Sequence, residues 1–442
     1  MTTTPFQAAR RLAVEYDVNV NSSEPHSAFN PVTAANDFLE RSVKVAKGGG
    51  LLHVYDDASG VYRPGMDLLK NLLVDFLGET WRPARADAVL RYLDDAAPCL
   101  WERPPSDRVN VRNGILNLAT GELKSHTPTW LSPTQIGADW NPDAGCPHIS
   151  SFVDDVVSSD TAKLVYEIAG LLCVPDMTFQ TAMVLLGAGN NGKSTLIRLL
   201  RALVGAENVA HVGLHELGSN RFAAAELYGK LANLCADIPN RKPASVATFK
   251  AITGGDPITA ERKYGHPFTF EPFSRLVFSA NSVPDSPDTS PAYLRRWQVI
   301  PFPNRFQGDK ADRNLLDKLT TPEELSGFLS LAVEAYQGLQ ERGHVSTAES
   351  TDQAKLAFEE DVAHVLTFLG KKTLLDTRAD VDRARLADAY RDWCEFEAHH
   401  APLTRQKFFE EVRQHVPGIT EKTVRGRPTW VGLGLTAGSK PG

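Results

Sequence analysis

The stretch TAMVLLGAGNNGKSTLIRLLRALVG, residues 181–205, decides the fold of this chain of 442 residues. It opens with Thr181 to Leu186, a short apolar run of the kind that forms a buried β-strand. From Ser194 to Val204 apolar residues recur at helical spacing, and Gly205 stands where the helix should be capped. The stretch therefore predicts a strand, a glycine-rich loop and a helix in direct succession.

The loop between that strand and helix fits the pattern G-x-x-x-x-G-K-[ST] without a mismatch. Gly187 and Gly192 allow backbone angles that turn several N–H groups toward one phosphate, and the helix N-terminus adds partial positive charge. Lys193 would reach the β- and γ-phosphates, and the hydroxyl of Ser194 would ligate Mg²⁺. The alternative is a chance glycine turn before a buried helix, which the flanking strand and helix disfavour. The residues expected to bind a nucleoside triphosphate are Gly187, Ala188, Gly189, Asn190, Asn191, Gly192, Lys193, Ser194 and Thr195.

The composition is that of an ordinary soluble globular protein, with 42% hydrophobic and 23% charged residues. The chain has neither a long apolar run nor a signal-peptide core, so we expect a cytoplasmic protein without a membrane span. Its five cysteines are scattered without a C-x-x-C pair, which argues against disulfides and zinc. A net charge of −7 disfavours a surface coated by nucleic acid, but it permits a narrow DNA channel or a small DNA-binding module.

Three domains are expected along the chain, at residues 1–145, 146–345 and 346–442. The first is expected to be a small α+β region with an amphipathic helix at Met66–Leu77. In the same region, Val109–Leu118 and Glu122–His126 are expected to pair as two strands around a turn at Thr120-Gly121.

The middle domain is expected to be an α/β domain built on a parallel sheet. Apolar runs that suit strands buried on both faces follow the loop at Leu231–Ile238, Arg275–Asn281 and Trp297–Phe302. The segment Glu324–Arg342 has the spacing of a closing helix.

The third domain is expected to be a winged helix, in which helices are followed by a β-hairpin. Helical spacing recurs in Asp361–Leu369, Arg385–Phe396 and Gln406–Val416. Thr404 is placed to cap the last of these helices. Two strands within Glu421–Leu435 would then turn near Gly426.

Polar residues stand at the ends of two of the predicted central strands. Asp237 would hold Mg²⁺ through water, as the strand-tip acid of a P-loop enzyme does, and its alternative role is to cap the next turn. Asn281 would face the γ-phosphate and orient the attacking water, or would simply form a turn before Pro284. No second acid adjoins Asp237, so either it also activates the water or another residue does.

Two basic segments complete the set of candidate residues. Residues 253–270 predict a hairpin with Lys263, Tyr264 and His266 at its tip, where a charge could meet a DNA phosphate and a ring could brace a sugar or base. The pair Arg295-Arg296 precedes the last central strand and could neutralise charge during phosphoryl transfer. An exposed surface pair is an equally good interpretation of these two arginines.

Together these segments resemble the superfamily 3 helicases, and most closely the phage/plasmid primase–helicase family related to the poxvirus helicase-primase. The resemblance is carried by NRFAAAELYGKLANLCADIP (220–239), FKAITGGDPITAERKYG (249–265), FTFEPFSRLVFSANSVP (268–284) and AYLRRWQVIPF (292–302). Order, spacing and composition agree over about 120 residues, from Met183 to Pro303. A weaker likeness covers NGILNLATGEL (113–123), WNPDAGCP (140–147) and RPTWVGLGL (427–435).

The resemblance implies a P-loop AAA+-like superfamily 3 helicase core between an N-terminal collar-like domain and a C-terminal winged helix. It also implies a ring, usually hexameric, in which ATP binds between subunits and hairpins draw single-stranded DNA through the centre from 3′ to 5′. The family's motif positions fall on Lys193 (phosphate-loop lysine), Asp237 (strand-tip acid), Asn281 (polar sensor), Arg295 or Arg296 (arginine acting across the interface) and Lys263 (channel hairpin).

We therefore expect an ATP-dependent DNA helicase of a phage or mobile element, which needs ATP and Mg²⁺ and acts on single-stranded and forked DNA in the cytoplasm of a bacterial host. No primase carboxylate pattern is found, so a separate primase or a host replication protein would supply primers. The alternative is an origin-binding initiator or loader ATPase whose nucleotide binding only controls assembly. In that case Arg425 and Arg427 would supply charge for duplex binding.

Overall fold

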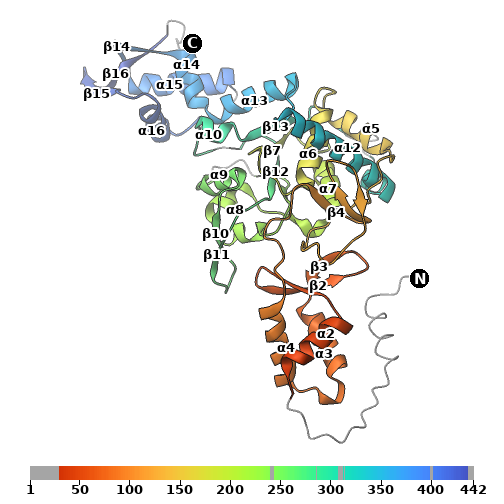
Figure 1. The fold of residues 1–442 in the computed structure, drawn as a ribbon. Coiled ribbons are helices and arrows are strands. Elements are labelled where there is room, and N and C mark those ends of the chain that lie inside the picture. Colours follow the sequence, from red (N-terminus) through yellow and green to blue (C-terminus); the bar gives the residue numbers. More distant parts are fainter. Residues whose placement is uncertain are drawn as a thin grey trace, which may run out of the picture.

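The computed structural model describes residues 29–238, 243–284, 286–306, 312, 314–398 and 402–436. An N-terminal unit, a small antiparallel sheet, a central α/β unit and a C-terminal unit follow one another along the chain (Figure 1). The N-terminal and C-terminal units lie on different sides of the central unit (Figure 1). No helix among the described residues is both long and apolar enough to cross a membrane.

The N-terminal unit packs helices against an antiparallel sheet with the strand order β1-β2-β3. Its elements are α2 (Pro31–Arg41), β1 (Val45–Gly48), β2 (Leu51–Asp56), β3 (Val61–Pro64), α3 (Met66–Leu77) and α4 (Pro83–Ala96). Helix α3 has the bounds that the sequence predicts. Its Leu69 and Leu73 lie on one face, as helical spacing requires, and are buried with Val54 of β2.

The segment that was expected to form one strand, Val109–Leu118, is itself a hairpin. Strands β4 (Arg108–Val111) and β5 (Gly114–Asn117) pair antiparallel within it. The expectation of a single strand was wrong because Asn113-Gly114 is a turn signal that interrupts the apolar run.

A second turn in this small sheet is confirmed. Gly121 has a φ of 72°, in the left-handed region that glycine favours, and β6 (Leu123–Lys124) pairs with β5 after it. Leu116 and Leu118 are buried in the same cluster as the helices of the central unit. The small sheet is therefore packed on the central unit rather than on the N-terminal helices.

The central unit is built on a five-stranded sheet in which every neighbouring pair of strands is parallel. In sheet order the strands are β13 (Trp297–Pro301), β7 (Ala182–Leu186), β12 (Arg275–Ala280), β9 (Ala232–Cys235) and β8 (Val209–Ala210). The parallel α/β sheet predicted from the apolar runs is confirmed. Strand β8 was not predicted, because its 2 residues are too few to show a pattern.

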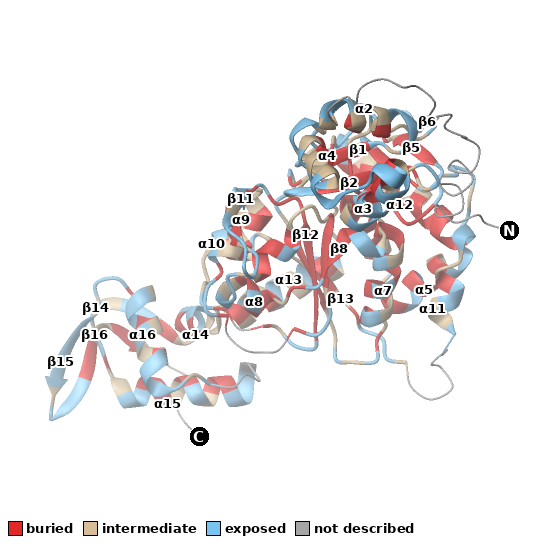
Figure 2. Cartoon of the chain, turned by 90° about the horizontal axis from the view of Figure 1, so that it is seen from below, coloured by how far each residue is buried: buried red, intermediate tan, exposed pale blue. Residues whose placement is uncertain are grey.

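Helices cover both faces of the central sheet, whose strands are largely buried (Figure 2). Alternate residues of β7 face opposite sides, so Met183 and Leu185 join one hydrophobic cluster while Ala182 and Val184 join the other. The first layer contains α5 (Pro147–Val156), α6 (Ala162–Cys173), α7 (Lys193–Val204), α11 (Leu315–Leu319) and α12 (Pro322–Arg342). The second layer contains α8 (Leu214–Ser219), α9 (Ala247–Gly254), α10 (Pro291–Leu294) and α13 (Glu349–Val362).

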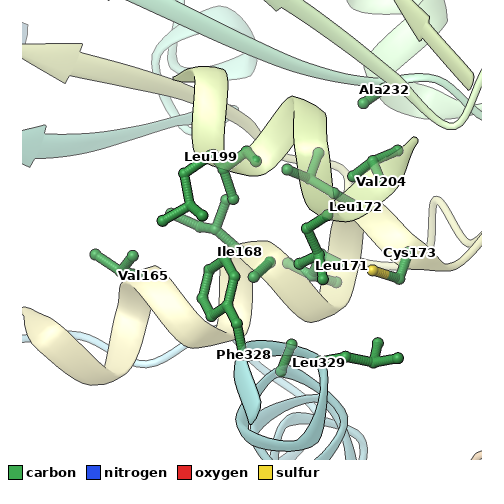
Figure 3. Packing of buried hydrophobic residues seen from close by; sticks show 14 of the residues in the cluster. Val165, Ile168, Leu171, Leu172, Cys173, Leu199, Val204, Ala232, Phe328 and Leu329 are labelled. Atoms are coloured by element: carbon green, nitrogen blue, oxygen red, sulfur yellow. The ribbon is translucent and has the colours of Figure 1, made fainter. Parts of the chain in front are cut away.

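Helix α6 lies at the centre of the first layer (Figure 3). Its Ile168 lies between Leu199 of α7 and Phe328 of α12, and all three are buried (Figure 3). A Cβ at Gly170 would come within 2.4 Å of the carbonyl oxygen of Ala332, so α12 approaches α6 closely only because this residue is glycine. This packing fixes α7, the helix that follows the glycine-rich loop.

Helix α13, which the expected boundary at residue 346 would assign to the third domain, packs against the central sheet. The ring of Phe358 lies 5.7 Å from that of Trp297. At the start of α13, the backbone N–H and hydroxyl of Ser350 donate to Asp160 at 3.0 and 2.7 Å. The next hydrophobic core begins with Val365, so the change from one core to the next falls after α13.

The C-terminal unit places helices against a three-stranded antiparallel sheet with the order β14-β16-β15. Its elements are α14 (His364–Lys372), β14 (Thr373–Asp382), α15 (Arg383–Trp393), α16 (Arg405–His415), β15 (Thr420–Val424) and β16 (Arg427–Leu435). The predicted cap is confirmed, because the side chain of Thr404 accepts a hydrogen bond from the N–H of Lys407. The predicted turn is confirmed by Gly426, whose φ is 77°. Strand β14 was not predicted, since its Leu374 and Leu375 are exposed and give no alternating pattern.

A buried carboxylate ties the central helices together and generates a stability prediction. Glu167 of α6 is fully buried, and it accepts hydrogen bonds from Arg342 at the end of α12 and from the N–H of Ser346 at 2.9 Å. Glu167→Ala should lower the free energy of unfolding by about 2–4 kcal/mol, because the donors lose their partner. Arg342→Ala should cost at least as much, because it leaves the fully buried carboxylate without its cation, whereas the Arg342 left behind by Glu167→Ala is 30% exposed and can be hydrated. Chemical denaturation of the two variants tests this, and a cost for Arg342→Ala well below that of Glu167→Ala would contradict it.

Candidate functional site

The glycine-rich loop joins the carboxyl end of β7 to the amino end of α7. Its backbone enters the left-handed region at Gly189 (φ 91°), Asn190 (φ 49°) and Gly192 (φ 89°). Gly187 was expected to need such an angle as well, and here the structure corrects the sequence interpretation. Gly187 is required for space, because a Cβ there would lie 2.1 Å from the amide nitrogen of Asn191 and 2.6 Å from the carbonyl oxygen of Phe302.

Lys193 is held inside the loop by oxygen atoms. Its side-chain ammonium donates to the carbonyl of Gly187 at 2.5 Å, to the amide oxygen of Asn191 at 2.8 Å and to the amide oxygen of Asn281 at 3.3 Å. The residue is only 5% exposed. Burial lowers the pKa of the ammonium, and the nearby carboxylate of Asp237 acts in the opposite direction. The loop therefore presents a partly desolvated cation that already bonds to oxygen acceptors.

Asp237 and Asn281 follow neighbouring strands and meet beside Lys193. The amide nitrogen of Asn281 lies 3.4 Å from a carboxylate oxygen of Asp237. Asp237 itself has a φ of 60°, and its N–H donates to the hydroxyl of Ser279 on β12 at 3.0 Å. Because β9 and β12 run parallel, their carboxyl ends share one edge with the glycine-rich loop. The structure therefore brings together three residues that the sequence singled out from three separate segments.

The remaining loop residues lie in the first turn of α7 or contact the segment that follows β13. Ser194 is exposed and Thr195 is half-buried. The N–H of Phe306 donates to the carbonyl of Asn190 at 2.7 Å. The guanidinium of Arg305 lies 3.5 Å from the carbonyl of Ala188. Arg305 was not predicted as a site residue, although its position just after a predicted central strand was the available signal.

The arginine pair lies at the opposite edge of the sheet. Strand β13 runs parallel to β7 with Trp297 opposite Ala182, so Arg295 and Arg296 precede the amino end of β13. Arg296 donates through Nε to the hydroxyl of Thr253 at 3.0 Å and also bonds to the carbonyl of Ala292. Burial, followed by the neighbouring charge of Arg295, lowers the pKa of Arg296.

Arg295 differs from its neighbour in its exposure and in its contacts. It is exposed and makes no side-chain hydrogen bond or ion pair with the part of the chain that the structure describes. The structure therefore places neither arginine beside Lys193 of the same chain, and only Arg295 presents a free guanidinium.

The predicted hairpin consists of β10 (Ile258–Glu261) and β11 (Pro267–Phe270), which pair antiparallel. Lys263, Tyr264 and His266 are all exposed at its tip, and Tyr264 is 94% exposed with a φ of 65°. The ammonium of Lys263 lies 5.1 Å from the ring centroid of Tyr264. The hairpin projects from the central unit on the side of the N-terminal unit (Figure 1).

The base of the hairpin contacts the N-terminal unit. Arg262 lies over the rings of Tyr228 and Phe268, at 5.6 and 5.2 Å, and donates to the carbonyl of Gly49 at 3.2 Å. Gly49 occupies the turn between β1 and β2 with a φ of 57°. Arg262 therefore has a positioning role at the base, distinct from the exposed residues at the tip.

A metal centre built from protein ligands alone is not found among the described residues, which contain no group of three His, Cys, Asp or Glu side chains suited to it. Cys146 is buried with its thiol 3.8 Å from the hydroxyl of Ser150, as expected for a structural residue. A Mg²⁺ ion that is bound mainly by phosphates and water needs fewer protein ligands. Ser194 and Asp237 remain the residues predicted to contact Mg²⁺.

Two family models match separate parts of the chain. The model described as "D5 N terminal like" matches residues 47–158, and the model described as "Family of unknown function (DUF5906)" matches residues 185–296. The first spans most of the N-terminal unit, the small antiparallel sheet and α5. The second spans the glycine-rich loop, the strand-tip residues, the hairpin and the arginine pair.

A curated relative and a solved structure agree with these matches. The protein named "Putative helicase L207/L206" of Acanthamoeba polyphaga mimivirus is 27% identical over 183 residues, which cover 36% of this chain and 19% of the relative. The chain thus matches about a fifth of that relative's length. The apo structure of the NrS-1 C-terminal region is 13% identical and superposes with a TM-score of 0.52, covering 92% of this chain and all of that one. This second likeness concerns the fold.

The sequence motifs, the two family matches and the shared fold agree in order along the chain. Together they support the assignment of the chain to the phage-type primase–helicase family.

Proposed function

We propose that this chain is an ATP-dependent DNA helicase of the superfamily 3 type, which unwinds DNA in the replication of a phage or mobile element. The observation behind this proposal is the meeting of Lys193, Asn281 and Asp237 at the edge of the sheet that holds the glycine-rich loop. An acid and an amide at neighbouring strand tips beside such a loop is an arrangement that P-loop enzymes use. The mimivirus relative, which is named as a helicase, supports the same class.

The loop suits a triphosphate in shape and charge. At Gly189 a Cβ would meet nothing within 4 Å, so the crest of the loop is open to a ligand. Lys193 would exchange the carbonyl of Gly187 and the amide of Asn191 for phosphate oxygens. Ser194 and Asp237 would hold Mg²⁺, which neutralises phosphate charge when bound. Asn281, which contacts both Lys193 and Asp237, would orient the water.

Arg295 is the candidate for a charge supplied by a neighbouring subunit. It precedes the amino end of β13, whereas Lys193 follows the carboxyl end of β7, so the two residues lie at opposite edges of one sheet. A strand of five residues separates these edges by roughly 15 Å, which no side chain spans. An exposed guanidinium in that place can act on phosphates only across an interface. This geometry supports a ring in which each nucleotide lies between two copies, and we propose six copies as in the resembled family.

The hairpin is the candidate DNA contact. Lys263, Tyr264 and His266 offer an ammonium and two rings on a projecting turn, which suits one strand with exposed phosphates and bases. In the ring the hairpins would line the central channel and move DNA from 3′ to 5′. The C-terminal unit has the order helix, strand, helix, helix, strand, strand, which supports the assignment of a winged helix.

The nucleotide site is tested first. Lys193→Ala should lower ATP turnover by at least about a hundredfold, because it removes a buried donor aimed at the phosphates. Arg198→Ala is the matched control, since Arg198 is an exposed cation on the same helix. Phosphate release measured at saturating ATP and Mg²⁺ gives the comparison. Full turnover by the Lys193→Ala protein would refute the assignment of the loop.

The arginine across the interface is tested by mixing variants. Arg295→Ala should reduce turnover by about a thousandfold, as loss of an arginine finger does. In an equal mixture with Lys193→Ala protein, about a quarter of ring interfaces would join an intact Lys193 to an intact Arg295, and turnover should return in proportion. Arg296→Ala should not be rescued in this way, because Arg296 bonds within its own chain. An Arg295→Ala mixture that stays inactive would contradict the shared site.

The hairpin is tested on forked DNA. Lys263→Ala should abolish strand separation, whereas Lys70→Ala, which removes an exposed lysine from α3, should leave it unchanged. Circular dichroism of both proteins controls for folding. Unwinding by the Lys263→Ala protein at the wild-type rate would remove the hairpin from the mechanism.

One observation favours the alternative of an origin-binding initiator. Arg425 and Arg427 flank the turn between β15 and β16, are exposed and make no ion pair with the described residues. In an initiator, replacing both by Ala should remove site-specific duplex binding, and the hairpin variant should leave that binding intact. In the helicase proposed here the same double variant should still unwind forks.

A further inference from the structure

Helix α9 connects the hairpin of β10 and β11 to the rest of the central unit. The helix ends at Gly254, and Gly255 caps it with a φ of 74°. Only Asp256 and Pro257 separate this cap from β10. The ring of Pro257 restricts that link, so a displacement of the hairpin is passed to the carboxyl end of α9 rather than absorbed.

The side of α9 contacts the segment that carries Arg295. The ammonium of Lys250 lies 2.7 Å from the carboxylate of Asp288, and their side chains are 35% and 19% exposed. The other carboxylate oxygen of Asp288 accepts a hydrogen bond from the N–H of Ser290 at 2.8 Å, directly before α10. Lys250 is therefore linked to the start of the short helix that leads to Arg295.

Two further contacts join α9 to the same segment. Thr253 is fully buried, and its hydroxyl accepts a hydrogen bond from Nε of Arg296 at 3.0 Å. The ring of Phe249 stacks on that of Trp297 with centroids 4.7 Å apart and planes at 20°. Phe249, Lys250 and Thr253 are spaced so that they share one face of the helix. Three contacts of different chemistry thus hold residues 288–297 against α9.

We propose that Lys250 and Thr253 are positioning residues through which DNA on the hairpin controls the placement of Arg295 in the nucleotide site of the next subunit. This inference rests on the proposed function, because it requires the hairpin to bind DNA and Arg295 to act across an interface. Both the hairpin and the arginine pair lie at the edge of the sheet opposite the glycine-rich loop. A rigid helix between them transmits a shift at the pore to the subunit interface without passing through the loop of its own chain.

The ion pair and the buried hydroxyl are the elements to change. Lys250→Met removes the charge and keeps a long side chain, while Lys250→Arg keeps the charge. Thr253→Val keeps the shape and removes the acceptor for Arg296. Lys318→Met is the matched control, because Lys318 lies on α11 in the other layer of the central unit and forms an equally short ion pair with Asp312, at 2.7 Å.

The experiment measures ATP turnover of the full-length protein with and without single-stranded DNA, together with DNA affinity and thermal stability. Lys250→Met and Thr253→Val should keep turnover without DNA and DNA affinity within about twofold, and should lower the stimulation by DNA by about tenfold, which lies within the usual range of coupling between sites. Lys250→Arg and Lys318→Met should be stimulated like the wild type. In the Lys263→Ala background, Lys250→Met should cause no further loss of stimulation.

Three results would overturn the inference. Unchanged stimulation in Lys250→Met and Thr253→Val, alongside lost stimulation in Lys263→Ala, would refute it while leaving the proposed function standing. Equal losses of basal turnover, DNA affinity and thermal stability would show that these residues only support the fold. Loss of stimulation in Lys318→Met as well would show that the effect is not specific to α9. A wild-type protein without any ATP turnover would instead contradict the proposed function itself.

Discussion

Burial of both faces of the central sheet is the constraint on which the rest of the molecule depends. Strand β7 is wholly apolar, and the apolar residues of β7, β12 and β13 enter two separate hydrophobic clusters. Charged side chains are favoured only at the two edges of such a sheet, because a charge in either cluster would lose its hydration. Lys193, Asp237 and Asn281 therefore gather at the carboxyl edge. The same constraint places the hairpin and the arginine pair at the amino edge.

This separation has a mechanical consequence. A nucleotide and DNA bound at the two edges, as proposed, could not influence each other through the sheet, whose packed strands leave little room for deformation. Communication must pass through an element that touches the amino edge and can move as a body. Helix α9 meets this condition, because its contacts with Asp288, Arg296 and Trp297 are all to one segment. In a ring that segment would face the next subunit, so the signal would travel around the ring rather than within one copy.

Much of this arrangement could be predicted because local sequence and long-range packing agree in the central unit. The strand before the loop, helix α7 with Gly205 after it, and the tips at Asp237 and Asn281 follow from apolar runs and from the parallel order that such runs favour. Close contacts between chain segments could not be predicted from the sequence. Gly187 is needed because a side chain there would collide with the amide of Asn191 and the carbonyl of Phe302, and residue spacing does not reveal these neighbours. The partners of the arginines were equally hidden, because residue spacing does not show that Thr253 bonds Arg296 and leaves Arg295 free.

The charge distribution is compatible with the proposal that this acidic protein tracks a polynucleotide. The chain carries a net charge of −7, and several cations of the C-terminal unit are neutralised, as Arg405 is by Asp388 at 2.7 Å and Arg413 is by Glu421 at 2.9 Å. Two projecting turns each carry a cation that has no carboxylate partner among the described residues, Lys263 and Arg425. In each turn a non-glycine residue adopts a positive φ, Tyr264 at 65° and Arg425 at 50°, which turns the chain sharply and leaves its side chains in solvent. In the proposed function these tips would attract a phosphate backbone, while the net negative charge of the chain would oppose non-specific wrapping of DNA around it.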